Sequence, residues 1–287
     1  MTNFVTKLIL ILSDIKMHHT LFALPFAIMS AFIAAEGFPE VKALNWILVC
    51  MVGARSAAMT FNRIVDTKFD RLNPRTKSRP LADGSADPKT YWIFLALSSI
   101  LFVFSSFMLN KLAFYLSPVA LAIVFFYSFT KRFTSLSHVF LGFALSVAPV
   151  GAWVAICEKI SFVSLTLGAA VVFWLIGFDI IYSCQDVESD IQNHLHSIPR
   201  KLGVARALKI AAGAHVLMIL FLLILSVVPL LGSLYLGSVL IVGGLLIYEH
   251  SLIKANDLSK VNIAFFNVNG CISIFLMVIV IADCVWI

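Results

Sequence analysis

The chain has 287 residues, of which 61% are hydrophobic and 13% are charged, and its mean hydropathy is +0.99. An average soluble domain is about 45–50% apolar and about 25% charged, so these figures exclude a disordered chain and an ordinary soluble globule and indicate a polytopic membrane protein. The net charge of +6 does not point to nucleic-acid binding, because Lys and Arg accumulate in the cytoplasmic loops of membrane proteins.

Nine apolar runs follow one another along the chain and predict nine transmembrane helices in one all-α domain that covers residues 1–287. A helix crosses a bilayer in about 20 residues, and the runs lack the period-two alternation of strands. The predicted helices cover residues 20–36, 43–62, 91–109, 112–130, 137–157, 161–184, 210–230, 233–249 and 262–287.

The basic residues predict how these helices are oriented in the membrane. With a cytoplasmic N-terminus, the cytoplasmic segments hold 17 Lys and Arg residues, and the outer loops hold only Lys42, Lys111 and Lys159. This asymmetry is a strong positive-inside signal. The two long loops, 63–90 and 185–209, then face the cytoplasm, and we expect the chemistry there.

Two acidic clusters indicate an internal repeat. Asp66 and Asp70 close the second predicted helix, Asp186 and Asp190 close the sixth, and the offset is 120 residues in both cases. Parallel repeats of this kind occur in membrane proteins. We therefore expect a four-helix pseudo-repeat whose two halves run parallel.

The spacing of the clusters predicts that each presents its carboxylates on one helix face. Asn62 lies four residues before Asp66, and Asp179 lies seven residues before Asp186. Carboxylates at a helix C-terminus cost about 0.3–1 kcal/mol each, because the macrodipole is negative there. Neighbouring basic side chains could offset this cost, but Mg²⁺ suits the pattern better, since it is usually held by carboxylates together with substrate phosphates. Two opposing clusters would hold two ions with a diphosphate between them.

Basic side chains follow both clusters and could bind phosphate oxygens, because arginine forks and lysine charges are the usual phosphate partners. The alternative for each is a topogenic charge without a ligand. Phosphate binding and a topogenic role are equally supported for four residues, Arg71, Arg79, Lys131 and Arg132. We favour the topogenic reading for Arg75, Lys77 and Lys89.

Several segments resemble the UbiA family of membrane aromatic prenyltransferases. Residues 62–84 resemble its first aspartate-rich motif, and residues 186–199 resemble its second. Residues 19–26 and 127–133 resemble its first helix and the segment after its fourth. One departure is Arg63, the second residue of the first motif, which stands where the family pattern has an aspartate. Together with the run Ala-Arg-Ser-Ala-Ala-Met before the motif, this variant resembles the subgroup of 4-hydroxybenzoate polyprenyltransferases, which includes menaquinone-pathway members.

The resemblance implies a nine-helix enzyme of the bacterial inner membrane. Such an enzyme transfers a polyprenyl group from a polyprenyl diphosphate to an aromatic acid in ubiquinone or menaquinone biosynthesis, with Mg²⁺ as cofactor. The expected acceptor is 4-hydroxybenzoate, and a dihydroxynaphthoate is the alternative. The resemblance also implies that Asp66 and Asp70 hold one Mg²⁺ and Asp186 and Asp190 the other, with Asn62 as a further ligand or orienter.

The same resemblance suggests roles for four further residues. Tyr127 and Tyr182 could shield the allyl cation with their ring faces. Arg55 lies inside a span, where an arginine is expensive unless paired, so it is a candidate partner for the acceptor carboxylate. An internal pair of Arg55 with Asp179 or with a backbone carbonyl is an equal alternative. Asp179 could also be the base that restores the aromatic ring.

A membrane transporter is the main alternative from another class, because it too has parallel repeats and buried charges. Transporter sites usually lie near the bilayer midplane on broken helices, whereas these carboxylates lie at the predicted cytoplasmic ends. A purely structural protein would not account for two matched acidic helix ends. Within the family, prenylation of haem or chlorophyll is a further alternative.

Overall fold

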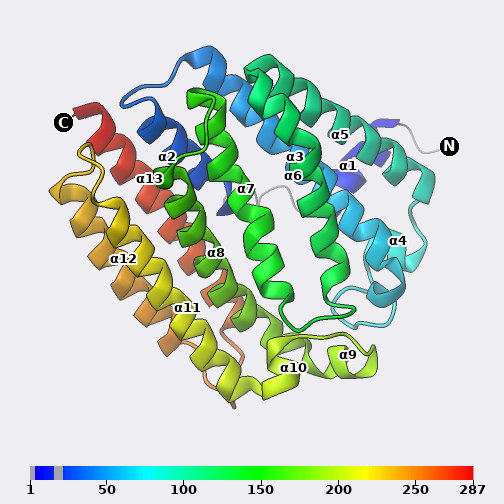
Figure 1. Ribbon diagram of the computed structural model, residues 1–287. Coiled ribbons are helices and arrows are strands. Elements are labelled where there is room, and N and C mark those ends of the chain that lie inside the picture. Colours follow the sequence, from blue (N-terminus) through cyan, green and yellow to red (C-terminus); the bar gives the residue numbers. More distant parts are fainter. Residues whose placement is uncertain (1–3, 16–21, 287) are drawn as a thin grey trace.

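The computed structural model describes residues 4–15 and 22–286, and within these residues the chain forms helices and no strand. Eight helices are long and apolar enough to cross a membrane, and they pack side by side as a bundle (Figure 1). They are α3 (Val41–Asp70), α5 (Pro88–Leu109), α6 (Lys111–Thr130), α7 (Ser137–Cys157), α8 (Phe162–Ser183), α11 (Val204–Leu225), α12 (Ser233–Ser251) and α13 (Asn269–Trp286). A π-helical segment, η3 (Ile263–Val268), leads into α13.

The first predicted span is the exception. Helix α2 (Leu24–Ala34) has eleven residues, which is about 16 Å at 1.5 Å per residue, against about 30 Å of bilayer hydrocarbon. Residues 20 and 21 of this run lie outside the described residues. Eight membrane-length helices are therefore confirmed, and the ninth is not.

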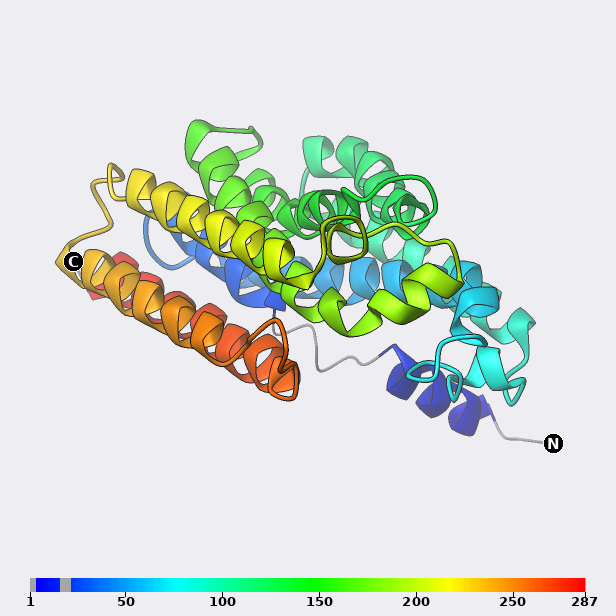
Figure 2. The same cartoon turned by 90° about the horizontal axis from the view of Figure 1, so that it is seen from below.

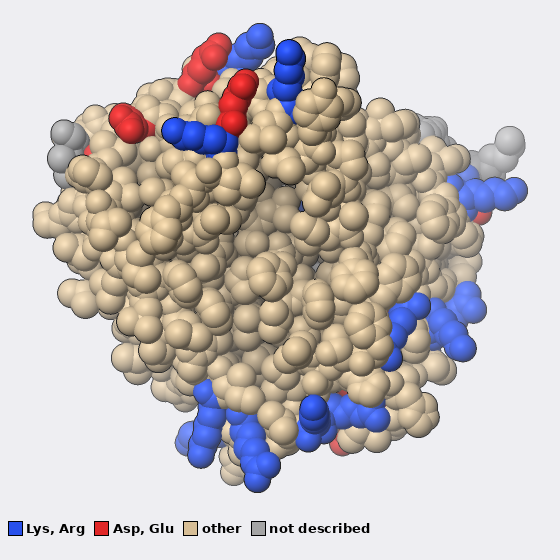
Figure 3. All heavy atoms as spheres, viewed as in Figure 1, with Lys and Arg blue, Asp and Glu red and all other residues tan. Residues whose placement is uncertain are grey.

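Helix α8 lies at the centre of the bundle, where it packs against α7 and α11. Its Trp174 is fully buried in a cluster with Phe26 and Met218, and its indole N–H donates a 2.6 Å hydrogen bond to Asn269 Oδ1 on α13. Buried amide and indole groups need such partners. The face of the bundle that Figure 3 shows is apolar between two charged ends, as expected for a lipid-facing surface.

Short helices that the apolar pattern did not predict gather at one end of the bundle (Figure 1). They are α4 (Pro80–Asp83), α9 (Val187–Gln192) and α10 (Ile198–Leu202), with the 3₁₀ turn η2 (Cys184–Asp186) before α9. Local signals set their limits, because proline is tolerated at a first helical turn and glycine accepts a positive φ. Pro80 begins α4 and Gly84, with φ of 84°, ends it.

A further short helix, α1 (Phe4–Asp14), lies beside this end of the bundle (Figure 2). Ile11 on α1 and the adjacent Ile15 are buried against Leu81 of α4 and Tyr91 of α5. Helix α1 is therefore held by an apolar contact with the loop that follows the first acidic cluster.

Candidate functional site

A pocket lies at the end of the bundle that carries α4, α9 and α10, and both acidic clusters line it. Asp66, Asp70, Asp186 and Asp190 come from the two halves of the chain and share this one pocket. The rest of its lining is mostly polar or basic, with two aromatic rings. It comprises Asn62, Phe69, Asn73, Arg75, Thr76, Arg79, Tyr127, Ser128, Lys131, Arg132, Ser189, Asn193 and Leu195.

The two clusters reach the pocket in different ways. Asp66 and Asp70 lie on the last turns of α3, as their spacing predicted. The prediction of a single helix face was wrong for the second cluster, because the backbone changes from α to 3₁₀ geometry over Cys184–Asp186. Asp186 therefore ends η2 while Asp190 lies on α9, and this turn brings both carboxylates to the pocket.

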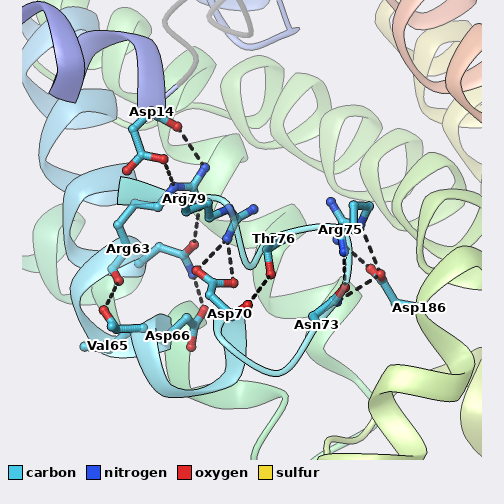
Figure 4. A network of polar contacts seen from close by, with 12 residues as sticks. Asp14, Arg63, Val65, Asp66, Asp70, Asn73, Arg75, Thr76, Arg79 and Asp186 are labelled. Atoms are coloured by element: carbon cyan, nitrogen blue, oxygen red, sulfur yellow. Dashed lines mark hydrogen bonds and ion pairs between the residues drawn. The ribbon is translucent and has the colours of Figure 1, made fainter. Parts of the chain in front are cut away.

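Every carboxylate of the pocket has a basic partner. Arg79 Nη1 contacts the two oxygens of Asp70 at 2.7 and 2.8 Å, and Arg132 contacts Asp66 at 3.2 Å. Charge-assisted hydrogen bonds of this kind are the strong ones. Acidic and basic side chains thus form pairs around the pocket wall, and Figure 4 shows the Asp70 pair.

The second cluster is paired in the same manner. Arg75 binds Asp186 through Nε at 3.1 Å and Nη2 at 2.8 Å, while Lys131 lies 3.8 Å from Asp190. Burial opposes the charge of Arg75, but the Asp186 carboxylate outweighs this effect, so the pKa of the Arg75 guanidinium lies above its ordinary value. Asp190 also accepts a 2.7 Å hydrogen bond from Ser197 Oγ.

Arg75, which the sequence analysis favoured as a topogenic charge without a ligand, lines the pocket. Besides binding Asp186, its Nη1 donates to the Tyr182 hydroxyl at 3.2 Å, and its guanidinium lies 5.3 Å from the ring centroid of Tyr182. The signal in the sequence is the Asn73-Pro74 turn before it, since Asn73 Oδ1 accepts the Arg75 backbone N–H at 2.9 Å and folds the chain back.

Arg71 does not line the pocket. Its Nε donates to the Ala82 carbonyl at 3.0 Å and so holds α4 against the end of α3. The other three predicted phosphate contacts, Arg79, Lys131 and Arg132, all line the pocket. We therefore remove Arg71 from the candidate set and add Arg75.

The amide of Asn62 has a defined orientation. Its Nδ2 donates to Asp66 at 2.7 Å, and its Oδ1 accepts from Arg63 Nη1 at 3.2 Å. Because a carboxylate only accepts and a guanidinium only donates, no other orientation of the amide satisfies both neighbours. This geometry favours a role for Asn62 in orienting Asp66 over a role as a metal ligand.

Arg63, the departure from the family pattern, points away from the pocket. Its Nε lies 3.3 Å from Asp14 Oδ1, and its Nη2 donates to the Asp14 carbonyl at 3.1 Å, as Figure 4 shows. The Tyr91 hydroxyl donates to the other Asp14 oxygen at 2.7 Å. Arg63 therefore joins the first acidic cluster to α1.

The alternative pair between Arg55 and Asp179 is not observed. Asp179 lies 2.6 Å from His138 Nδ1 instead, and sequence reasoning missed His138, because its approach to Asp179 depends on how α7 packs on α8. The Arg55 Nε is buried without a hydrogen-bond partner among the described residues.

The donor set of the pocket fits Mg²⁺. All four acidic side chains offer carboxylate oxygens, which are the ligands that this hard cation prefers. Among the described residues, no three His, Cys, Asp or Glu side chains converge into a ready-made cage. Mg²⁺ does not need one, because it usually binds one or two carboxylates and completes its shell with phosphates and water.

Comparison with known proteins places the chain among prenyltransferases. The 4-hydroxybenzoate octaprenyltransferase of Vibrio atlanticus is 32% identical over 254 residues, which are 87% of this chain and 88% of that protein. The protein of the same name from Vesicomyosocius okutanii is 31% identical over 229 residues, which are 79% and 82% of the two chains.

Solved structures show the same fold. The apo structure of a UbiA homolog from Aeropyrum pernix K1 superposes with a TM-score of 0.84 at 32% identity, over 93% of this chain and 98% of that one. A UbiA homolog from Archaeoglobus fulgidus bound to GPP and Mg²⁺ has a TM-score of 0.72 at 18% identity, over 95% and 99%. A model of the UbiA prenyltransferase family matches residues 23–271. This chain therefore belongs to the UbiA prenyltransferase family.

Proposed function

We propose that this enzyme transfers a polyprenyl group from a polyprenyl diphosphate to 4-hydroxybenzoate, in quinone biosynthesis at a bacterial inner membrane, with its pocket facing the cytoplasm. The observation that carries the proposal is the convergence of four carboxylates and four basic side chains on one pocket. The relatives named 4-hydroxybenzoate octaprenyltransferase support this acceptor, and a dihydroxynaphthoate is the alternative. The pocket lies at the end of the bundle rather than at its middle, which supports an enzyme over a transporter.

The four carboxylates would hold two Mg²⁺ ions, one on Asp66 and Asp70 and one on Asp186 and Asp190. When bound, the ions would neutralise the charge that develops on the leaving diphosphate. The Archaeoglobus fulgidus homolog with GPP and Mg²⁺ supports this class of ligand. Asn62 would keep Asp66 oriented through its 2.7 Å hydrogen bond.

The basic partners of the carboxylates would bind the phosphate oxygens. A carboxylate that held a metal ion would leave its basic partner without a counter-charge, and a phosphate oxygen would replace that charge. The four residues with this role are Arg75, Arg79, Lys131 and Arg132. The allylic C–O bond then breaks, and its electron pair leaves with the diphosphate.

The allyl cation would react with the acceptor ring beside these groups. Tyr127 lines the pocket, and Tyr182 lies under Arg75. The ring face of each tyrosine could stabilise positive charge. Arg55 would bind the acceptor carboxylate, because its buried Nε lacks a partner among the described residues. Asp179 would take the ring proton, which restores the aromatic system.

The experiment offers both acceptors to membranes that contain the protein, Mg²⁺ and a polyprenyl diphosphate, and detects prenylated product by mass. We expect product from 4-hydroxybenzoate. Asp66→Asn and Asp186→Asn should abolish transfer, whereas the exposed Asp83→Asn should not. Full activity in either pocket variant would refute the metal assignment. Absence of product from both acceptors, with intact protein and donors of several lengths, would refute the proposed function.

A further inference from the structure

Outside the residues that line the pocket, His138 and Asp179 form a hydrogen-bonded pair between α7 and α8. His138 is the second residue of α7 and is fully buried, and its Nδ1 lies 2.6 Å from Asp179 Oδ2 on α8. Asp179 is 19% exposed, and its second oxygen, Oδ1, has no hydrogen-bond partner among the described residues. The histidine thus occupies one carboxylate oxygen and leaves the other open.

The neighbours of His138 indicate the direction of its two hydrogen bonds. The backbone N–H of Ile198 donates to its Nε2 at 3.4 Å, so this nitrogen carries a lone pair and the ring proton resides on Nδ1. An imidazole that donates from Nδ1 requires an acceptor, which is Oδ2 of Asp179. The histidine therefore holds this oxygen of the carboxylate in place.

Two consecutive residues, Ser197 and Ile198, connect this pair to Asp190 in the pocket. Ser197 Oγ donates to Asp190 at 2.7 Å, and the next residue, Ile198, donates its N–H to His138. Both lie at the start of α10. Tyr127, which lines the pocket, lies near enough to Asp179 and to Asp66 for both carboxylates to act on its phenol. Asp179 is thus connected to the pocket through Tyr127 and, by way of His138 and the start of α10, through Asp190.

We infer that His138 is a positioning residue for Asp179 in the transfer reaction, an inference that rests on the proposed function. The ring carbon uses its π electrons to form the new bond to the allylic carbon, whose bond to oxygen breaks with the pair leaving on diphosphate. The C–H bond at that ring carbon then breaks, its electron pair restores aromaticity, and the proton goes to Asp179 Oδ1. His138 keeps its own proton throughout and holds the carboxylate in place.

A purely structural histidine would predict a different outcome. If His138 served only as acceptor for the Ile198 N–H, its loss would destabilise α10. The amounts of released diphosphate and of prenylated product would then fall together. A positioning role acts only after the donor has ionised. Diphosphate release and product formation therefore separate the two readings.

The test compares His138→Leu, which cannot form either hydrogen bond, with His138→Gln, whose amide can donate to Asp179 and accept from Ile198. Membranes with Mg²⁺, prenyl diphosphate and the aromatic acceptor are assayed for released diphosphate and prenylated product in the same sample. We expect His138→Leu to lower the ratio of product to diphosphate by about 10–100-fold, the usual effect of losing a partner that orients a reactive group. His138→Gln should keep the ratio within about threefold of the wild-type value.

His250→Gln serves as the matched control and should leave the ratio unchanged, because this half-buried histidine contacts His215 and does not line the pocket. If His138→Leu does not accumulate, His138→Asn replaces it, since this shorter amide cannot reach Asp179 and Ile198 together. An unchanged ratio in whichever variant is assayed, or a parallel loss of diphosphate release and product, would overturn the inference. Failure of the wild-type protein to prenylate any acceptor would instead overturn the proposed function.

Discussion

The ion pair between Arg63 and Asp14 should control whether α1 stays docked. Asp14→Leu or Arg63→Met removes one member of the pair and leaves the other charge buried. Asp14 would retain the Tyr91 hydrogen bond in Arg63→Met, whereas Arg63 in Asp14→Leu would keep only the backbone carbonyl and Asn62 as acceptors. Helix α1 has no other ion pair to the bundle among the described residues.

The size of the effect follows from burial. Both side chains are only 4% exposed, and removing one partner of a buried ion pair costs about 3–5 kcal/mol. At about 1.4 kcal/mol per factor of ten, the ratio of docked to detached α1 should fall between about a hundredfold and a few thousandfold. The double variant leaves no buried charge and should regain most of this loss.

Hydrogen exchange of the α1 backbone amides measures this ratio directly, because local opening sets their exchange rate. We expect faster exchange over α1 in each single variant and recovery in the double variant. Lys77→Met removes an exposed basic side chain from the same end of the bundle and should leave α1 unaffected. Unchanged α1 exchange in both single variants would refute the claim that the pair holds this helix.

Two further predictions concern the core. Gly177→Ala places a methyl group against the His215 ring, which cannot move easily because it is hydrogen-bonded to the Trp174 carbonyl. It should cost about 1–3 kcal/mol and lower the Tm of the solubilised protein, and an unchanged Tm would contradict the close approach of α8 and α11. Trp174→Phe leaves the buried Asn269 oxygen without its 2.6 Å donor and should cost about 1–3 kcal/mol. Its prenyl-transfer activity should persist at low temperature, and a loss of activity in folded protein would contradict this purely structural role.

The fold was largely predictable, because a membrane helix is encoded by a local run of apolar residues. The predicted runs 112–130 and 137–157 agree within a residue with α6 and α7. The short length of α2 was not predictable. Its eleven residues are mostly buried within the bundle, and a buried helix has the same apolar composition as a membrane-spanning one. The polar helices α4, α9 and α10 were missed because proline and capping residues mark them, not hydropathy.

The carboxylates of the site were predictable, but their partners were not. Spacing along a helix places Asp66 and Asp70 on one face, whereas the contact between Arg75 and Asp186 joins residues 111 positions apart. Such contacts depend on how helices pack and on how loops return. The same reason hid His138, which approaches Asp179 only because α7 lies against α8.

The pairing of acids with bases in the pocket should couple the binding of a metal ion to the binding of a diphosphate. A metal ion that arrived alone would take a carboxylate from Arg75 or Arg79 and strand a guanidinium beside a second positive charge. A diphosphate that arrived alone would strand the carboxylates in the same way. Each ligand therefore removes the electrostatic penalty of the other, so the two should bind with positive cooperativity. Under the proposed function, the four acid–base pairs would balance the ligand-free pocket and would be replaced only when both ligands bind together.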